Sequence, residues 1–373
     1  MDRPLRDALT GALMLAVGMG FGRFAFTGLY PQMMTDGVLD LRGGSLAASA
    51  NYAGYLLGAL LLAWKHPWQP ATLCRAGLFG SLACLLAMAA APSVTSVLPL
   101  RLLAGVASAL TLVGASLWLL RADHHPRAAP VLYAGVGLGI LLSAELLAAG
   151  QRLGWHSPAQ WLLLGIAALM LILPATLALR QTTPTTATQA PPERALPAAR
   201  LVTLYGLAGF GYIVTATYLP LLLRDGLNGI DPLQIWAAFG LGAVPSCFLW
   251  HGLRERLGTR RALALNLGLQ AIGVALPALD DGLAGGLLSA LLVGGTFMGT
   301  VTIAMAAARG ESRHTPQLAA WMTASYGVGQ IAGPLLAEAL HGHFRHFAPA
   351  LLCAAAGLAL AALLSLPRPA PAT

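Results

Sequence analysis

The sequence contains Gly20-Phe21-Gly22-Arg23-Phe24-Ala25-Phe26-Thr27-Gly28-Leu29-Tyr30-Pro31 and, 189 residues later, Gly209-Phe210-Gly211-Tyr212-Ile213-Val214-Thr215-Ala216-Thr217-Tyr218-Leu219-Pro220. Both stretches open on Gly-Phe-Gly and reach a proline nine residues after the second glycine. A second pair, Gly135-Val136-Gly137 and Gly327-Val328-Gly329, is separated by 192 residues. Two matches at nearly one offset indicate that the chain repeats one unit in two similar halves.

The composition places these halves in a membrane. Of the 373 residues, 57% are hydrophobic and only 10% are charged, and the mean hydropathy is +0.70. This apolar content exceeds what one soluble core can bury, which excludes a soluble enzyme. The apolar residues form runs of roughly 20, the length of a helix that spans a bilayer. The twelve predicted spans are 9–31, 45–64, 72–91, 96–120, 128–149, 159–180, 201–223, 232–250, 262–279, 283–307, 317–340 and 347–366.

The basic residues set the predicted orientation. The chain has 22 Lys and Arg against 14 Asp and Glu, but the basic residues flank apolar segments and do not indicate a nucleic-acid partner. With the N-terminus inside, sixteen of them lie in inner segments, four in outer loops and two within spans. The positive-inside rule then predicts a multi-pass protein of a bacterial-type inner membrane with both termini cytoplasmic and an uncleaved first span.

A polar stretch divides the twelve spans into six and six. Residues 181–200 are rich in Thr, Pro and Ala, the composition of a flexible tether. We expect residues 1–180 and 201–373 to form two all-α six-helix bundles, joined by this cytoplasmic linker and related by a pseudo-two-fold axis. In transporters built this way the substrate site lies between the halves near mid-membrane. None of the four cysteines has C-x-x-C spacing, so we expect no metal site of that type, and no cofactor motif is present.

One loop carries a family resemblance. Between the eighth and ninth spans the chain reads Gly252-Leu253-Arg254-Glu255-Arg256-Leu257-Gly258-Thr259-Arg260-Arg261. This resembles the G-x-L-[AD]-D-R-x-G-R-[RK] loop of the major facilitator superfamily. An acid and several arginines at a helix corner can pair across two helices and hold an inner gate shut in one state. The alternative is a basic cluster that follows the positive-inside rule without a gating role. The gate residues would be Gly252, Glu255, Arg256, Gly258, Arg260 and Arg261.

Further blocks extend the resemblance over the whole chain. The stretch 20–31, Ala48-Ser49-Ala50-Asn51-Tyr52-Ala53-Gly54-Tyr55 and Ser325-Tyr326-Gly327-Val328-Gly329-Gln330-Ile331-Ala332-Gly333-Pro334 are similar to the YbfB/YjiJ-type branch of that superfamily. Arg101-Leu102-Leu103-Ala104-Gly105 resembles the R-x-x-x-G element of its fourth span. The resemblance implies a twelve-helix major facilitator fold and a transporter driven by the proton-motive force. Two departures leave a symmetric gate and the direction of transport open: residues 64–70 lack the D-R-x-G-R core, and the fifth span lacks Gly-Pro.

Three ionisable residues within the predicted spans are the main site candidates. Arg23 lies near the middle of the first span, where a charge should face a cavity or a partner. It could bind a substrate carboxylate or phosphate, or join a proton-coupling charge network. A structural role, in which it pairs with Glu145 or fills a polar contact between helices, is the alternative. Glu145 is the candidate proton-binding group of that network, with a water-exposed carboxylate at the helix end as the alternative. Arg101 could join the network or only snorkel to the interface.

Uncharged polar residues complete the candidate cavity. Asn51, Tyr52, Tyr212, Thr215 and Gln330 lie in spans expected near the axis. Hydrogen bonding between helices accounts for each of them equally well. The repeat places Tyr212 at the position equivalent to Arg23, so the charge is expected on one half only.

These observations favour a secondary active transporter that moves a small organic anion or zwitterion by alternating access, coupled to protons. Proton-driven efflux of hydrophobic or drug-like compounds is the alternative, and a non-transporting sensor or a membrane enzyme is less favoured because no catalytic constellation is present. The absence of a Walker loop excludes primary active transport for this chain alone. His341, His343 and His346 have a spacing that could hold a metal, but no acid or cysteine joins them, and we expect no metal. We expect a monomer in the lipid bilayer whose partners are a small-molecule substrate and protons.

Overall fold

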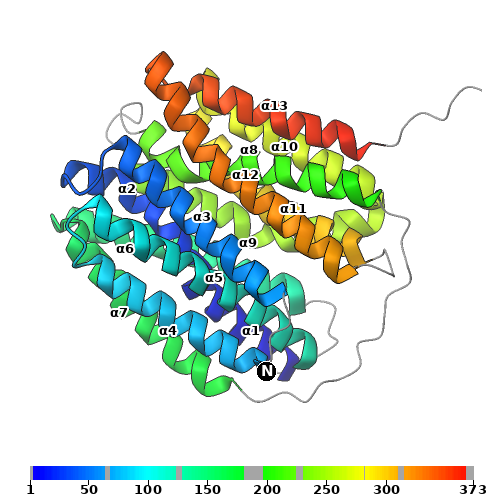
Figure 1. The fold of residues 1–373 in the computed structure, drawn as a ribbon, viewed down its shortest axis with the longest axis horizontal. Helices are drawn as coiled ribbons and strands as arrows, with labels where there is room; N and C mark the ends of the chain where they lie inside the picture. Colours follow the sequence, from blue (N-terminus) through cyan, green and yellow to red (C-terminus); the bar gives the residue numbers. More distant parts are fainter. Residues whose placement is uncertain are drawn as a thin grey trace, which may run out of the picture.

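The computed structural model describes residues 3–63, 68–122, 128–179, 196–223, 230–280, 282–309 and 315–366, and these residues are helical apart from short connections. Figure 1 shows the helices as one bundle of long, roughly aligned rods. Their bounds are α1 Arg3–Leu15, η1 Ala16–Phe24, α2 Ala25–Thr35, α3 Leu41–Ala63, α4 Pro70–Met88, α5 Val94–Ala122, α6 Ala128–Arg152, α7 Ser157–Ala178, α8 Ala198–Leu222, α9 Pro232–Leu257, α10 Thr259–Leu279, α11 Leu283–Arg309, α12 Thr315–Phe344 and α13 Ala348–Ser365.

The predicted twelve-helix, all-α membrane fold is confirmed. α1, η1 and α2 follow one another without a break and form the first span, so the described chain has twelve helical spans. Eleven of them are long and apolar enough to cross a membrane by length and composition alone. The remaining span, α12, contains the polar residues Gln330 and Glu338 and carries His341 and His343 in its last turn. The protein is therefore a multi-pass membrane protein.

The helices before and after residues 180–195 form two groups. In Figure 1 the helices α1 to α7 occupy one side of the bundle and α8 to α13 the other. Between the groups, α6 packs against α9 and α12 packs against α3. Most of the predicted linker lies outside the described residues, and α8 begins at Ala198, three residues earlier than the predicted span. The domain division at residues 181–200 stays a prediction.

One hydrogen bond marks the axis that relates the two groups. The Thr27 hydroxyl donates to the carbonyl oxygen of Ala216 at 2.6 Å, and the two residues are 189 positions apart. This separation equals the offset of the sequence repeat, so the two residues are repeat equivalents. Equivalent positions meet only at a symmetry axis, which places α2 and α8 beside each other on the pseudo-two-fold axis.

Glycines allow the first span to approach its neighbour α6 closely. A Cβ added at Gly20 would lie 2.4 Å from the Cα of Gly139, a distance that no real carbon pair adopts. The backbones of η1 and α6 are therefore in direct contact, as in other membrane helix crossings built on small residues. The contact fixes the helical segment that carries Arg23, one turn further along the chain.

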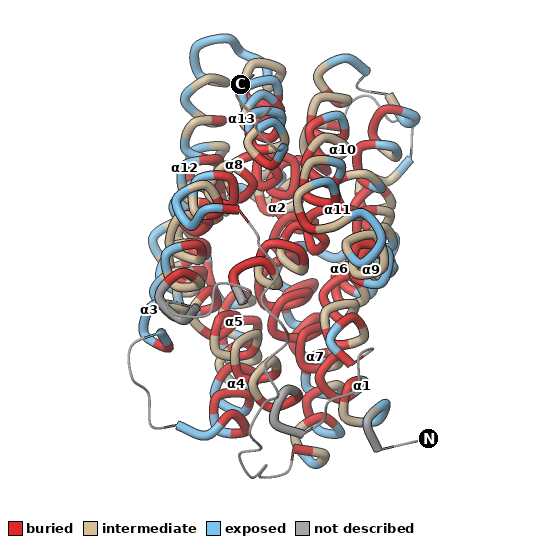
Figure 2. Tube along the Cα trace, turned by 90° about the vertical axis from the view of Figure 1, so that its right-hand side faces the viewer, coloured by how far each residue is buried: buried red, intermediate tan, exposed pale blue. Residues whose placement is uncertain are grey.

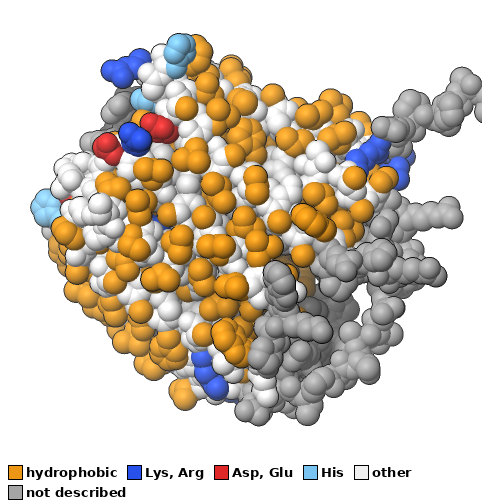
Figure 3. All heavy atoms as spheres, in the orientation of Figure 1, with side chains coloured by type: hydrophobic (Ala, Val, Ile, Leu, Met, Phe, Trp, Pro, Cys, Tyr) orange, Lys and Arg blue, Asp and Glu red, His pale blue; other side chains and the backbone are white. Residues whose placement is uncertain are grey.

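The burial pattern agrees with a bilayer environment. Figure 2 shows buried residues concentrated between the helices and exposed residues on the outward faces and at the ends. The outward faces carry large apolar side chains, among them Leu61, Met170, Leu177 and Trp321, each more than 60% exposed. Figure 3 shows hydrophobic side chains across the middle of the face in view, with charged side chains and histidines near its edges. Such an apolar belt is what lipid contact requires.

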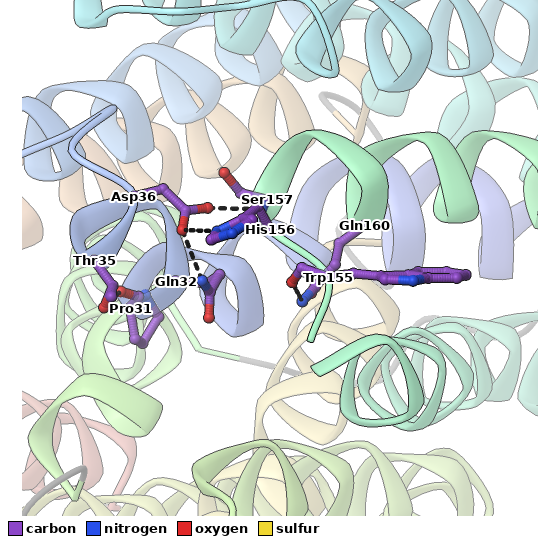
Figure 4. A network of polar contacts seen from close by, with 8 residues as sticks. All are labelled: Pro31, Gln32, Thr35, Asp36, Trp155, His156, Ser157 and Gln160. Atoms are coloured by element: carbon purple, nitrogen blue, oxygen red, sulfur yellow. Dashed lines mark hydrogen bonds and ion pairs between the residues drawn. The ribbon is translucent and has the colours of Figure 1, made fainter. Parts of the chain in front are cut away.

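A polar network closes one end of the helices α2 and α7. The Asp36 carboxylate, at the C-terminal end of α2, accepts hydrogen bonds from the Ser157 backbone N–H at 2.6 Å and from Gln32, and contacts the His156 ring at 2.9 Å (Figure 4). Burial alone would raise the pKa of Asp36, but the hydrogen bonds from His156, Ser157 and Gln32 outweigh it and lower the pKa to about 2. Asp36 thus supplies the negative cap that the N-terminus of α7 needs.

Candidate functional site

A cavity of about 480 Å³ lies between the two groups of helices. It extends from Arg23 in the middle of the bundle towards the end at which α3 and α11 finish and α12 begins, since Ala63, Met305 and Ala319 line it there. Because consecutive helices alternate in direction, the corner between α9 and α10 lies at this same end. The volume falls within the range of small-molecule sites.

Arg23 lies at the closed end of this cavity in a segment of unusual geometry. η1 is a π-helix, a rare form that is frequent at functional sites. The Arg23 side chain is 3% exposed, and its Nη2 donates to the Oε1 of Gln330 at 2.9 Å. The amide of Gln330 in turn donates to the Tyr212 hydroxyl. The two repeat-equivalent residues, Arg23 and Tyr212, are therefore connected through one glutamine from α12.

The rest of the Arg23 guanidinium has no hydrogen-bond partner among the described residues. Its Nε and Nη1 are buried without an acceptor. Aromatic rings surround it instead, with the Cζ atom 4.1 Å from the ring centroid of Tyr55, 5.1 Å from that of Tyr52 and 5.4 Å from that of Phe24. Cation–π attraction offsets part of the desolvation cost of the charge. Two donors remain available to an acceptor that enters the cavity.

Arg101 holds the π-helical segment rather than lining the cavity. Its side chain is 2% exposed, and it donates to the carbonyl oxygens of Gly22 at 3.2 Å and Arg23 at 2.9 Å. The guanidinium also lies over the Phe26 ring, 4.5 Å from its centroid. Snorkelling to the interface is therefore wrong for this residue. Arg101 positions the backbone from which Arg23 projects.

Four stacked aromatic rings from the C-terminal helices form the opposite wall of the cavity. Phe297 of α11 stacks on Tyr212 of α8, with centroids 5.5 Å apart and an angle of 14° between the planes. Tyr212 stacks on Tyr326 of α12 at 5.8 Å, and Tyr326 on Tyr205 at 4.5 Å. We call Phe297, Tyr212, Tyr326 and Tyr205 the aromatic wall. Such stacks are stabilised beyond their buried area, and they give this side of the cavity an apolar aromatic surface.

Hydrogen bonds between the two groups of helices seal the bundle beyond Arg23. The Tyr52 hydroxyl bonds to that of Thr217 at 2.9 Å, and the hydroxyls of Ser45 and Tyr218 bond at 2.6 Å. Tyr218 also donates to the carbonyl oxygen of Pro334 at 3.1 Å. We call Ser45, Tyr52, Thr217 and Tyr218 the outer seal. The cavity is thus open towards one end of the molecule and closed towards the other.

The structure separates the predicted cavity residues into two sets. Arg23, Tyr212 and Gln330 line the cavity. Asn51 does not, because its amide is fully buried and donates to the carbonyl oxygen of Arg101 at the crossing of α3 and α5. Thr215 is also fully buried and outside the lining, and Tyr52 belongs to the outer seal. For Asn51 and Tyr52, hydrogen bonding between helices is the interpretation that fits.

Glu145 is not brought to Arg23. It is exposed on an outward face of α6, between the exposed residues Leu142 and Ala149, and is not part of the cavity lining. The hypothetical ion pair with Arg23 is therefore wrong, because the 3.6-residue period of α6 turns position 145 away from the packed side. Leu132, Val136 and Ile140 occupy the buried side of the helix.

The predicted gate loop forms the corner between α9 and α10. Gly258 ends α9 and precedes α10 with φ 77° and ψ 160°, a conformation that is essentially restricted to glycine. Gly252 has no such requirement, since a Cβ there would meet nothing within 4 Å. Glu255 contacts His251, one turn earlier on its own helix, at 3.4 Å. The arginines Arg254, Arg256, Arg260 and Arg261 surround this corner, and the gating role stays a prediction.

The histidine spacing near the end of α12 does not produce a metal cluster in the described part of the chain. No group of three or more His, Cys, Asp or Glu side chains there is arranged to hold a metal ion. His341 instead packs on Phe347, with ring centroids 4.5 Å apart, and His343 meets Phe344 edge to face. The histidines cover aromatic rings at the end of the helix.

Most of the aromatic lining lies outside the site predicted from the sequence. Tyr205 and Phe297 carry no sequence signal that separates them from packing residues. Tyr55 and Tyr326 stand inside the quoted family blocks, but those blocks contain many more buried residues than lining ones. A helical projection that aligns Tyr205 with Tyr212, seven residues and two turns later, is the one signal that points to this face.

Comparisons with known proteins identify the family and the fold. The family model described as "Uncharacterised MFS-type transporter YbfB" matches residues 15–366. No curated protein matches. Among solved structures, a mutant of the nucleoside transporter NupG superposes with a TM-score of 0.72, covering 98% of this chain and 99% of that chain at 15% identity. An identity this low shows the shared fold alone. The match over most of its length shows that the chain belongs to the YbfB-type family of major facilitator superfamily transporters.

Proposed function

We propose that this protein is a secondary active transporter that moves a small organic anion, or a zwitterion held by its carboxylate, by alternating access. Arg23 is the observation that carries the proposal. Among the described residues it has no carboxylate partner, and a cation that is 3% exposed, with two unpartnered donors at the end of a 480 Å³ cavity, is costly to maintain. An anionic solute would supply the missing partner.

The proposed orientation makes the cavity an inward-facing one. Among the described residues, ten arginines lie near the end where the cavity opens and three near the opposite end, and the positive-inside rule assigns the arginine-rich end to the cytoplasm. In a bacterial-type inner membrane both termini are then cytoplasmic, and the outer seal closes the external side. Transport would break the outer seal and close the gate loop end around the bound solute.

Coupling to protons is part of the proposal, but the geometry favours a route without Glu145. Among the described residues that line the cavity there is no acidic side chain. Vesicles that contain a Glu145→Gln protein should therefore couple solute flux to a pH gradient as the wild type does, and loss of coupling would return the role to Glu145.

The experiment that tests the proposal compares wild type with Arg23→Gln in the full-length protein. Purified protein is screened for thermal stabilisation by a panel of monocarboxylates, dicarboxylates, amino acids, nucleosides and lipophilic cations, because a ligand of the native state raises its apparent stability. We expect organic anions to stabilise the wild type and not the variant. The stabilising anion should then produce saturable flux in proteoliposomes, which a sensor or an enzyme would not.

Efflux of hydrophobic or drug-like compounds is the second candidate, and the aromatic wall is the observation that favours it. The rings of Phe297, Tyr212, Tyr326 and Tyr205 would accept an apolar compound without any charge. In the same screen, lipophilic cations that stabilise wild type and Arg23→Gln equally would support efflux and contradict anion transport.

A further inference from the structure

The cavity presents a charge from one group of helices and an apolar aromatic surface from the other. Arg23 comes from η1 in the N-terminal group, whereas the aromatic wall comes from α8, α11 and α12 in the C-terminal group. The planes in the aromatic wall are inclined by only 14° to 30°. A ligand that satisfies both has a charged end and an apolar body, and an aromatic body can pack offset or edge to face against such rings.

The charge inventory of the cavity limits that ligand to one negative charge. Arg23 is the one Lys or Arg side chain among the described lining residues, and no Asp or Glu joins it. Arg101 is turned away, with its donors on the carbonyl oxygens of Gly22 and Arg23. A dianion would leave one charge without a partner in a site of low polarity, and each uncompensated buried charge is strongly unfavourable.

The serine, threonine and glutamine side chains of the lining are already engaged within the protein, which disfavours sugars and nucleosides. The hydroxyls of Ser116 and Tyr133 bond to each other at 3.2 Å, and the Thr323 hydroxyl donates to the carbonyl oxygen of Ala319 at 2.8 Å. Gln330 is engaged by Arg23 and Tyr212. A ligand with several hydroxyls would lose its water without gaining enough partners in return.

We propose that the transported solute is an aromatic monocarboxylate. Its carboxylate accepts from an unpartnered N–H of Arg23, at Nε or at Nη1, and its ring packs on the aromatic wall. The proposal rests on the function proposed above and narrows its substrate class. Such a ligand contacts η1 in one group of helices and α8, α11 and α12 in the other. Its binding therefore favours the conformation in which the two groups are closed around it.

The probe for this inference is 2-naphthoate, measured by thermal stabilisation and by the quenching of its own fluorescence on the full-length protein. The neutral isostere 2-naphthamide tests the charge, decanoate tests the ring, 2,6-naphthalenedicarboxylate tests the charge number, and uridine tests the nucleoside alternative. The variants are Arg23→Gln, the charge-retaining Arg23→Lys and Phe297→Leu. The matched control is Arg42→Gln, which removes an exposed arginine from the same group of helices.

We expect 2-naphthoate to bind wild type and Arg42→Gln alike, and to bind Arg23→Gln at least tenfold more weakly, because a charge-assisted hydrogen bond is lost. Arg23→Lys should recover part of the affinity. Phe297→Leu should weaken 2-naphthoate and leave decanoate unchanged. The comparison of 2-naphthoate with 2-naphthamide uses the wild type alone. The charge requirement can therefore be tested even if the Arg23→Gln protein does not fold.

Four results would overturn the inference. Equal binding of 2-naphthamide would remove the charge requirement, and tighter binding of the dicarboxylate or of uridine would replace the substrate class. Decanoate binding that depends on Arg23, without 2-naphthoate binding, would sink the aromatic class and leave anion transport standing. If no anion of any kind stabilises the wild type, both the inference and the proposed function fail.

Discussion

The close contact between η1 and α6 predicts a steep penalty for one added methyl group. In Gly20→Ala the new Cβ would lie 2.4 Å from the Cα and 2.5 Å from the carbonyl carbon of Gly139. Carbon atoms pack at about 3.5 Å or more, so the two helices must separate by about 1 Å. The obstructing atoms are backbone, and no side-chain rotation can relieve the contact.

The magnitude follows from two opposing effects. Overpacking costs up to about 3 kcal/mol, whereas alanine is favoured over glycine in a helix by about 1 kcal/mol. The net expectation for Gly20→Ala is a loss of about 2 kcal/mol in the free energy of unfolding. Gly268→Ala in α10 is the control, because its Cβ meets nothing within 4 Å, and it should gain up to about 1 kcal/mol.

Thermal unfolding of the two variants beside wild type measures the difference. The same samples report on the site, since a displaced η1 moves Arg23 and should weaken any anion that stabilises the wild type. Gly268→Ala should leave that stabilisation unchanged. If Gly20→Ala unfolds at or above the temperature of Gly268→Ala, the direct backbone contact does not exist and the reasoning about Arg23 placement falls with it.

The outer seal, the gate loop and the polar network of α2 each carry one further prediction. Tyr52→Phe removes one hydrogen bond between the halves at a cost of about 0.5–1.5 kcal/mol. The population of the externally open state should therefore rise about two- to twelvefold, measured as faster alkylation of Ala216→Cys in a background without the native cysteines. Gly258→Ala should lose about 1–3 kcal/mol because of its backbone conformation, whereas Gly252→Ala should be neutral in the same unfolding assay. The lowered pKa of Asp36 stabilises the folded state above about pH 4, and this contribution should disappear as the pH falls towards 2; the stability difference between wild type and Asp36→Asn should shrink over that range, and a constant difference would contradict it.

The fold was predictable because its signals are long and repeated. Twelve apolar runs, each bounded by charged or proline-rich segments, need no fine geometry, since lipid imposes helices on all of them. The sequence repeat also predicted the pseudo-two-fold axis between the two groups of helices. The offset of 189 residues, read from Gly-Phe-Gly motifs, reappears as the hydrogen bond between Thr27 and Ala216. The ends of the helices were harder to predict than the helices themselves. Polar residues lie near both ends of α12, and hydropathy alone does not show where among them the helix begins and ends.

The site was only partly predictable, because burial in a membrane helix depends on rotation about the helix axis. Arg23 and Glu145 look alike in the sequence, as isolated charges inside apolar runs. η1 turns Arg23 into the cavity, whereas α6 turns Glu145 outwards. The glycines at positions 135 and 139 mark the packed side of α6, and position 145 lies off that side. Glycine spacing along a membrane helix therefore indicates which of its charges face the packed interior.

The position of Arg23 on the repeat also gives a reason why only one half carries a charge. Its equivalent is Tyr212, and Gln330 bonds to both. Two arginines at these equivalent positions would lie close together on the axis and repel each other at low dielectric, unless a dianion joined them. With Arg23 in one half and Tyr212 in the other, the site instead has a single cation and a ring that stacks on Phe297 and Tyr326. The asymmetry of one repeat position thus turns a symmetric bundle into a site for one charge and one apolar aromatic surface.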